Sequence, residues 1–191
     1  MKKNNTGGTK LPIFMNLKAL CFAAILSAMS IVLGKFLQIP NPFQDFIRLS
    51  FENLPIILAG ISLGPLVAML VGVAADLIGC LAYGYSINPI ITAGACAVGL
   101  VSGIIGKYVI KKPLLFQVSF SVFLSHAIGS VLIKSYGLAV WYLDKYQLGY
   151  WEFVLWRLVN YLIVGALEAL IIYLLLKNRA FRNQLERMCK K

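Results

Sequence analysis

The sequence has few charged residues and almost no histidine. Of its 191 residues, 13% are charged and one is a histidine, whereas 60% are hydrophobic. A soluble domain usually has about 25% charged and about 45–50% apolar residues, and one soluble core of this length could not bury so much apolar side chain. The composition argues against a soluble enzyme, a disordered chain, a collagen-like repeat and a disulfide scaffold, and it indicates a protein whose main solvent is lipid.

Motifs for metals and nucleotides are also missing. The four cysteines include no Cys-x-x-Cys pair, and one histidine cannot make a His-Glu-x-x-His motif. The segment Gly129–Ser135 lacks the glycine that precedes the lysine of a phosphate-binding loop, and it lies within an apolar run. We therefore expect a protein that is not an enzyme and has no cofactor and no metal. Any uphill transport would take its energy from an ion gradient or another subunit.

Acidic residues are scarce, with seven Asp and Glu against 18 Lys and Arg, which gives a net charge of +11. Such an excess could indicate nucleic-acid binding. The basic residues, however, lie in short loops and tails between apolar runs, which is typical of membrane topology. We therefore expect a chain that is embedded in a lipid bilayer and binds no nucleic acid.

Six apolar runs could form membrane helices, for which about 20 residues cross the hydrocarbon core. The second run is short and ends at Gly64-Pro65, which should break a helix. The first run is longer than the apolar region of a signal peptide, so we expect it to be retained. The predicted fold is an all-α membrane protein with six transmembrane helices in one bundle: Leu17–Leu37, Leu49–Leu63, Pro65–Tyr83, Ile90–Ile110, Leu114–Tyr136 and Phe153–Leu176.

The basic residues are divided unevenly between the two sides of this bundle. One side holds both termini, the Gly64-Pro65 turn and the Lys111-Lys112 loop, and it carries 13 Lys and Arg against five on the other side. The positive-inside rule then places both termini in the cytoplasm. We predict a cytoplasmic tail at residues 1–16, a membrane domain at 17–177 and a basic cytoplasmic tail at 178–191.

Polar residues within or beside the apolar runs carry the functional prediction. A charge at a helix centre costs about 2.5–3.5 kcal/mol, so it usually faces the bundle interior or a cavity. The outer side offers more bases than acids, which suits an anionic ligand, whereas internal ion pairs such as Asp76–Arg157 are the alternative. The candidate ligand-binding residues are Arg48, Glu52, Asn53, Asp76, Tyr83, Asn88, Lys134, Tyr136, Trp141, Arg157, Asn160 and Tyr161.

Two polar residues are predicted to be structural. Glu168 follows Arg157 by eleven residues, or about 16 Å along a helix, so we expect it below the cavity and either paired or protonated. The single histidine, His126, is more typical of a hydrogen-bonded packing residue than of a ligand-binding one.

Small residues recur at four-residue spacing on the first and fourth helices, where they allow close helix packing in lipid. On the fourth helix one register, Ala95, Gly99 and Gly103, indicates packing inside the bundle. On the first helix two registers overlap, and the wider face fits internal packing or docking on another membrane protein. Its residues are Ala19, Ala23, Ala24, Ser27 and Ala28.

The segment Arg48–Ile56, with the sequence RLSFENLPI, and the stretch from Gly60 to Gly79, with GISLGP and DLIG, resemble a known family. They are similar to the substrate-binding S components of energy-coupling-factor (ECF) vitamin transporters, most of all to the folate-specific one. The resemblance implies a multi-pass protein of a cell membrane of the Gram-positive bacterial type. It also implies docking, through the first helices, on a transmembrane coupling (T) subunit driven by two cytoplasmic ATPases.

Folate also fits the residues. Its pterin presents an adjacent N–H and amine to one carboxylate, from Asp76 or Glu52, and its ring suits aromatic packing. Its tail carboxylates suit Arg48, Lys134 or Arg157. The predicted function is high-affinity folate binding in an outward-facing cavity. Because sister S components bind other vitamins on the same bundle, the alternative is a vitamin of the pantothenate, hydroxymethylpyrimidine or pyridoxine type.

Overall fold

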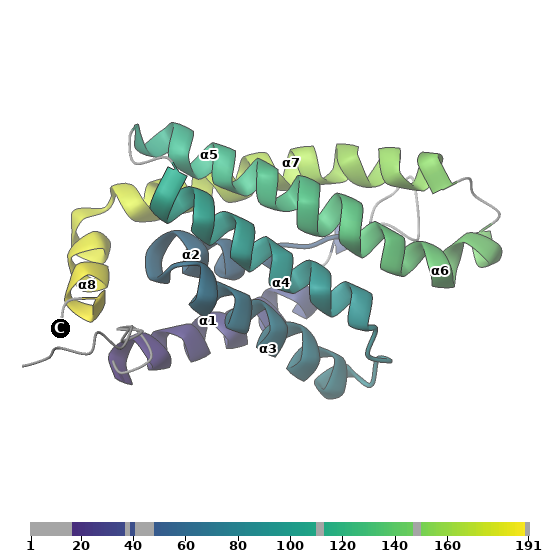
Figure 1. Ribbon diagram of the computed structural model, residues 1–191, viewed down its shortest axis with the longest axis horizontal. Coiled ribbons are helices and arrows are strands. Elements are labelled where there is room, and N and C mark those ends of the chain that lie inside the picture. Colours follow the sequence, from purple (N-terminus) through teal and green to yellow (C-terminus); the bar gives the residue numbers. More distant parts are fainter. Residues whose placement is uncertain (1–16, 37–38, 41–47, 110–112, 147–149, 190–191) are drawn as a thin grey trace, which may run out of the picture.

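The structure is a computed structural model that describes residues 17–36, 39–40, 48–109, 113–146 and 150–189. Most helices run along one long axis, and α8 crosses one end of the bundle (Figure 1). The helices are α1 (Leu17–Phe36), α2 (Asn53–Leu63), α3 (Pro65–Tyr83), α4 (Pro89–Ile104), α5 (Leu114–Ser125), α6 (Lys134–Tyr146), α7 (Tyr150–Lys177) and α8 (Arg179–Cys189), with π-helical segments η1 (Ile105–Val109) and η2 (His126–Ile133).

In the described part of the chain, five helical stretches are long and apolar enough to cross a membrane, and the all-α membrane fold is confirmed. The second predicted span is shorter than expected, because α2 has 11 residues. At about 1.5 Å per residue such a helix covers about 16 Å, roughly half of the hydrocarbon core. The five long stretches are Leu17–Gly34, Pro65–Tyr83, Pro89–Val109, Leu114–Val140 and Tyr150–Lys177.

The predicted break between the second and third helices is confirmed at Gly64. Its φ of +102° lies in a region that favours glycine, because a Cβ would be strained there. Pro65 follows at the start of α3, where its missing N–H has no intrahelical partner to lose. The two residues therefore end one helix and begin the next.

The small residues of the fourth helix pack inside the bundle, as expected. A Cβ on Gly99 would collide with the backbone of Ala68, and one on Gly103 would collide with the backbone of Pro65. Ala95 is buried as well. Glycine and alanine thus let α4 approach α3 at backbone distance, which is how helices associate when lipid removes the hydrophobic drive.

Three features were not predicted. Residues of the first loop form a two-residue antiparallel pair, β1 (Ile39–Pro40) with β2 (Arg48–Leu49). The fifth run continues through η2 and α6 to Tyr146, beyond its predicted end at Tyr136. The predicted C-terminal tail contains α8, whose Leu185 is buried against the bundle.

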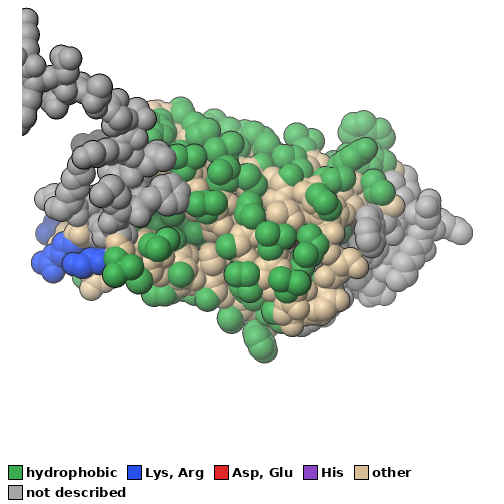
Figure 2. Space-filling model, turned by 60° about the horizontal axis from the view of Figure 1, so that its bottom comes forward, with side chains coloured by type: hydrophobic (Ala, Val, Ile, Leu, Met, Phe, Trp, Pro, Cys, Tyr) green, Lys and Arg blue, Asp and Glu red, His purple; other side chains and the backbone are tan. Residues whose placement is uncertain are grey.

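Exposed basic side chains gather at one end of the bundle, and hydrophobic side chains cover its flank (Figure 2). At this end lie Lys18 of α1, Lys107 of η1, Lys177 of α7 and Arg179 and Arg182 of α8. Lys107 also lies beside the Gly64 turn, since a Cβ there would be 3.1 Å from its Nζ. This arrangement agrees with the predicted cytoplasmic side, and the orientation itself stays a prediction.

Candidate ligand-binding site

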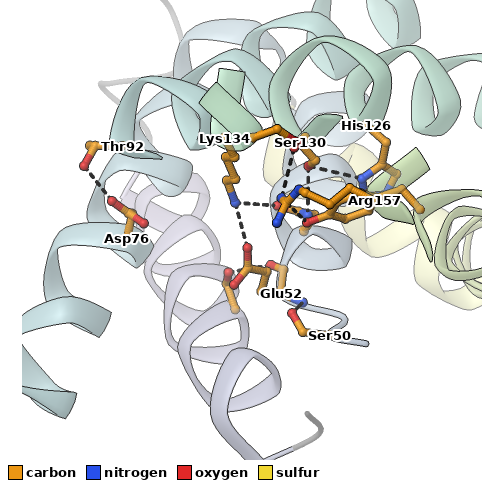
Figure 3. Close-up of polar contacts among 12 residues, drawn as sticks. Ser50, Glu52, Asp76, Thr92, His126, Ser130, Lys134 and Arg157 are labelled. Atoms are coloured by element: carbon orange, nitrogen blue, oxygen red, sulfur yellow. Dashed lines mark hydrogen bonds and ion pairs between the residues drawn. The ribbon is translucent and has the colours of Figure 1, made fainter. Parts of the chain in front are cut away.

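A group of polar side chains, which we call the polar cluster, is linked by hydrogen bonds where α2, η2, α6 and α7 meet (Figure 3). Most of its members are 8% exposed or less. Because buried charges are costly unless they are paired and hydrogen-bonded, the contacts of each member matter. The members are Glu52, Asn53, His126, Ser130, Lys134, Arg157, Tyr161 and Glu168.

Lys134 connects the cluster to the first loop. Its ammonium donates to Oε1 of Glu52 at 2.6 Å and to Oδ1 of Asn53 at 3.3 Å. Lys134 is buried, whereas Glu52 is only partly buried. The backbone oxygen of Glu52 accepts a hydrogen bond of 2.6 Å from Ser30 of α1. Ser30 therefore anchors the backbone of Glu52, and Lys134 holds its carboxylate.

Three members of the cluster lie four residues apart on one continuous helical stretch: His126, Ser130 and Lys134. Residues at this spacing lie near one another on a helix surface. The first two belong to η2, and π-helical segments occur frequently at functional sites. Gly129 and Gly94 let this stretch approach α4 closely, since a Cβ on Gly129 would lie 2.8 Å from the Gly94 oxygen.

Arg157 is a buried cation whose hydrogen-bond partners in the described part of the chain are uncharged. Its Nη2 donates to the Ser130 carbonyl oxygen at 3.0 Å and to the Tyr161 hydroxyl at 3.3 Å. Its Cζ lies 5.3 Å and 5.7 Å from the ring centroids of Tyr161 and Phe153, within range of cation–π attraction. Among the described residues, no carboxylate forms a salt bridge with it, and its buried Nε has no hydrogen-bond partner.

His126 and Glu168 form the inner part of the cluster. His126 Nε2 lies 2.6 Å from Glu168 Oε2, and both side chains are almost fully buried. The imidazole also stacks on the Tyr161 ring, with centroids 4.9 Å apart. Glu168 is thus paired, which is one of the two states expected from the sequence, and His126 is hydrogen-bonded as expected.

The suggested Asp76–Arg157 ion pair is not formed. Asp76 Oδ2 accepts a hydrogen bond of 2.6 Å from Thr92 of α4, at the side of the polar cluster (Figure 3). The idea of internal pairing was right for other residues, because Glu52 pairs with Lys134 and Glu168 with His126. The rise per residue gives the spacing of side chains along a helix, but it does not give the direction in which each side chain points.

Comparison with known proteins identifies the family. The family model described as "ECF transporter, substrate-specific component" matches residues 18–176. This chain belongs to that family. S components are transport subunits and not enzymes, and they pair with T and ATPase subunits and bind a vitamin substrate. The predicted family, the class of partners and the absence of enzyme activity are therefore confirmed.

A solved structure agrees with this assignment at the level of the fold. The crystal structure of FolT bound with folic acid is similar to this S component with a TM-score of 0.65 and 21% sequence identity. The match covers 83% of this chain and 90% of that chain. A search of the curated proteins found no match to the sequence of this S component. The substrate is thus a separate question from the family.

Two of the remaining predicted ligand-binding residues make contacts between helices. Tyr83 of α3 donates to the Ile31 carbonyl oxygen of α1 at 3.2 Å. Asn88 caps α4 by accepting from the Ile90 amide at 3.0 Å, and it donates to the Gly137 carbonyl oxygen at 3.0 Å. These contacts tie helices of the S component together, and neither residue belongs to the polar cluster.

The other four lie in different surroundings. Tyr136 is exposed, and Asn160 is buried on α7, one turn from Arg157. Arg48 lies in β2 and Trp141 in α6, but their side chains lie outside the described residues. The structure therefore brings together five of the twelve candidates, namely Glu52, Asn53, Lys134, Arg157 and Tyr161.

Sequence reasoning missed Ser130, which contacts three other members of the polar cluster. Its hydroxyl contacts Asn53 and His126, and its carbonyl oxygen accepts from Arg157. A lone serine in an apolar helix costs little free energy, so it gave no signal by itself. Its position midway between His126 and Lys134 was the signal that could have found it.

The two small-residue registers of α1 face different surroundings. Ala19, Ala23 and Ser27 are buried, and the Ser27 hydroxyl contacts the Val71 carbonyl oxygen of α3 at 3.5 Å. Ala24 and Ala28 are exposed. The first register therefore packs inside this S component, and only the second is on the surface, where a partner could contact it.

Proposed function

We propose that this S component binds folate, with the carboxylates of its tail beside Arg157 and Lys134. The observation that carries the proposal is the state of Arg157. Arg157 is 8% exposed, and among the described residues its Nε has no hydrogen-bond partner and the partners of its Nη2 are uncharged. A buried cation is strongly stabilised by a hydrogen-bonded anion. A carboxylate of the ligand would supply that anion.

The surroundings of Arg157 support a ligand with an aromatic ring. The rings of Phe153 and Tyr161 both lie within 6 Å of the guanidinium carbon. The benzoyl ring of folate connects its pterin to its carboxylates, so it would lie near these side chains when a carboxylate reaches Arg157. Similarity to FolT bound with folic acid also supports this choice, although at 21% identity it concerns the fold.

Lys134 would provide the second positive charge. It is held by Glu52, whose side chain is 36% exposed and can turn toward water. A ligand carboxylate could then bind the ammonium in its place, or it could bind beside Glu52. Asp76 is partly buried and accepts a hydrogen bond from Thr92, so its carboxylate remains a candidate for the pterin.

Another vitamin is the second candidate for the ligand, and the alternatives differ in whether they carry a carboxylate. Pantothenate carries a carboxylate and could also bind Arg157, whereas hydroxymethylpyrimidine and pyridoxine carry none. Two buried cations favour the ligands that are anions. We therefore place pantothenate next after folate.

Calorimetry on the detergent-solubilised protein tests the proposal. We expect folic acid to bind with one-to-one stoichiometry without ATP, metal or partner subunits. Arg157→Gln should weaken binding strongly, whereas Arg179→Gln, at an exposed position of α8, should leave it unchanged. No heat with folic acid, together with a clear response to another vitamin, would contradict the folate assignment.

We also propose that α1 contacts the T subunit through Ala24 and Ala28. Both are exposed and small, and they are separated by one helical turn. Exposed small residues let another membrane helix approach at backbone distance. This surface lies apart from the polar cluster, whose α1 contact is made by Ser30.

A further inference from the structure

A continuous chain of hydrogen bonds connects Lys134 with Glu168 through Asn53, Ser130 and His126. Lys134 Nζ lies 3.3 Å from Asn53 Oδ1, and Asn53 Nδ2 lies 3.3 Å from Ser130 Oγ. Ser130 Oγ lies 3.3 Å from His126 Nδ1, and His126 Nε2 lies 2.6 Å from Glu168 Oε2. All five side chains are at least nine-tenths buried.

The lysine fixes the direction of the first two bonds in this chain. An ammonium only donates, so Asn53 turns its oxygen toward Lys134 and its NH₂ toward Ser130. Ser130 Oγ accepts from Asn53, which leaves its single proton available for His126 Nδ1. When Ser130 donates this proton, His126 carries its own proton on Nε2 and donates it to Glu168. In this arrangement each donor points away from Lys134 and toward Glu168.

His126 also supports the second cation. Its ring stacks on Tyr161, whose hydroxyl accepts from Arg157 at 3.3 Å. Ser130 contacts His126 through its hydroxyl. Its backbone oxygen accepts a hydrogen bond from Arg157 at 3.0 Å. The histidine thus contacts two partners of Arg157, and it connects to Lys134 through Ser130 and Asn53.

We propose that His126 and Glu168 are positioning residues for ligand binding. Glu168 fixes the protonated nitrogen and the ring orientation of His126, and His126 fixes Ser130 and Tyr161. These two residues in turn direct Lys134 and Arg157 toward one anionic ligand. The proposal rests on the proposed function for its ligand. Its physical basis is that side chains held in place before binding lose less entropy when the ligand arrives, and that hydrogen bonds in a chain strengthen one another.

The first test needs no ligand, because the chain contains a single histidine. Nitrogen-15 NMR of histidine-labelled protein, purified through a histidine-free tag, reports His126 alone. We expect a neutral ring with its proton on Nε2. Ser130→Ala and Lys134→Met should each shift the His126 nitrogen signals. A proton on Nδ1, or unchanged signals in both variants, would overturn the proposal.

Two matched controls accompany this test. Ser125 is a buried serine on the same helical stretch, and its hydroxyl donates to the Ser121 carbonyl oxygen within the helix. Lys107 is exposed in η1, beside the Gly64 turn. Ser125→Ala and Lys107→Met should leave the His126 signals unchanged, and shifts as large as those of the test variants would overturn the proposal.

The second test measures folic acid binding. Glu168→Gln should weaken affinity several-fold, because it replaces a charge-assisted hydrogen bond to His126 with a weaker neutral one. Glu152→Gln, at an exposed position in the first turn of the same helix, should not. In a double variant with Lys134→Gln, Glu168→Gln should reduce the affinity less than it does alone, because both residues belong to the same chain of hydrogen bonds. Full additivity would overturn the positioning role.

The two tests separate two kinds of failure. If wild-type protein binds no folic acid, the proposed function fails, and the His126 signals of Ser130→Ala and Lys134→Met still decide the hydrogen-bond chain. If folic acid binds and Glu168→Gln binds it equally well, with an intact fold shown by an unchanged thermal unfolding temperature, the positioning role fails and the proposed function stands.

Discussion

The side chain of Lys134 runs directly across Gly94 of α4. A Cβ on Gly94 would lie 2.5 Å from Lys134 Cγ and 2.9 Å from the Gly129 carbonyl oxygen. The glycine therefore gives the lysine the space to run along α4 and reach Glu52. The position of a buried charge thus depends on the absence of a side chain on a neighbouring helix.

The first prediction concerns this space. Gly94→Ala should displace Lys134 or push η2 away from α4, and we expect folate affinity to fall about tenfold or more, since overpacking typically costs 1–3 kcal/mol. Gly79→Ala is the matched control, because its Cβ would meet only Ile31 Cγ1 at 3.9 Å, an ordinary contact. Calorimetry of both variants measures the difference, and equal affinities would show that Lys134 does not need this path.

The second prediction concerns the pair of Lys134 and Glu52. Lys134→Met should weaken folate binding by about 30-fold or more, since loss of one charge partner in a binding site costs about 2–5 kcal/mol. Glu52→Gln should weaken it less, because the amide still accepts a hydrogen bond from the ammonium. Titration of folic acid into both variants checks the order. The reverse order would make Glu52 the principal ligand-binding residue of the pair.

The third prediction concerns the anchor of Glu52 on α1. The Ser30 hydroxyl donates to the Glu52 backbone oxygen at 2.6 Å. Ser30→Ala should weaken folate binding several-fold, because one hydrogen bond contributes about 0.5–1.5 kcal/mol. Ser27→Ala is the control, since its hydroxyl makes a longer contact of 3.5 Å with Val71. If both variants bind folate like the wild type, the anchor does not affect the site.

Most of the fold could be predicted because membrane helices follow from hydrophobic run length. The break at Gly64-Pro65 followed from backbone chemistry, and it was placed correctly. The length of α2 was overestimated, because Arg48-Leu49 pairs with Ile39-Pro40 and does not join the helix. That pairing joins two segments apart in the chain, and single-residue preferences carry no information about it.

The site was predicted in part, for a similar reason. Lys134 and Arg157 were found because charges in apolar runs are costly and therefore rare. The partners of these two residues were not predicted, because the rise per residue gives the position along a helix and not the direction in which a side chain points. Ser130 contributes a carbonyl oxygen to Arg157, and every residue has a carbonyl oxygen. Only the packing of η2 against α7 makes this one important.

The last prediction concerns docking on the T subunit. Ala24→Trp adds a bulky group to an exposed position of α1, whereas Ala23→Trp would add it to a buried one. We expect Ala24→Trp to bind folic acid normally in detergent and to lose most folate uptake in cells that express the whole transporter, because close helix approach requires small residues. Ala23→Trp should instead reduce folding and binding together.

The matched control for docking is Ala166→Trp, at an exposed alanine of α7. It adds the same side chain to a different helix, so uptake should stay near the wild-type level if the surface at Ala24 is specific. Normal uptake by Ala24→Trp would exclude docking through this register. An equal loss in Ala24→Trp and Ala166→Trp would mean that any tryptophan on the membrane-facing surface impairs the transporter, and the contact with the T subunit would then have to be sought elsewhere.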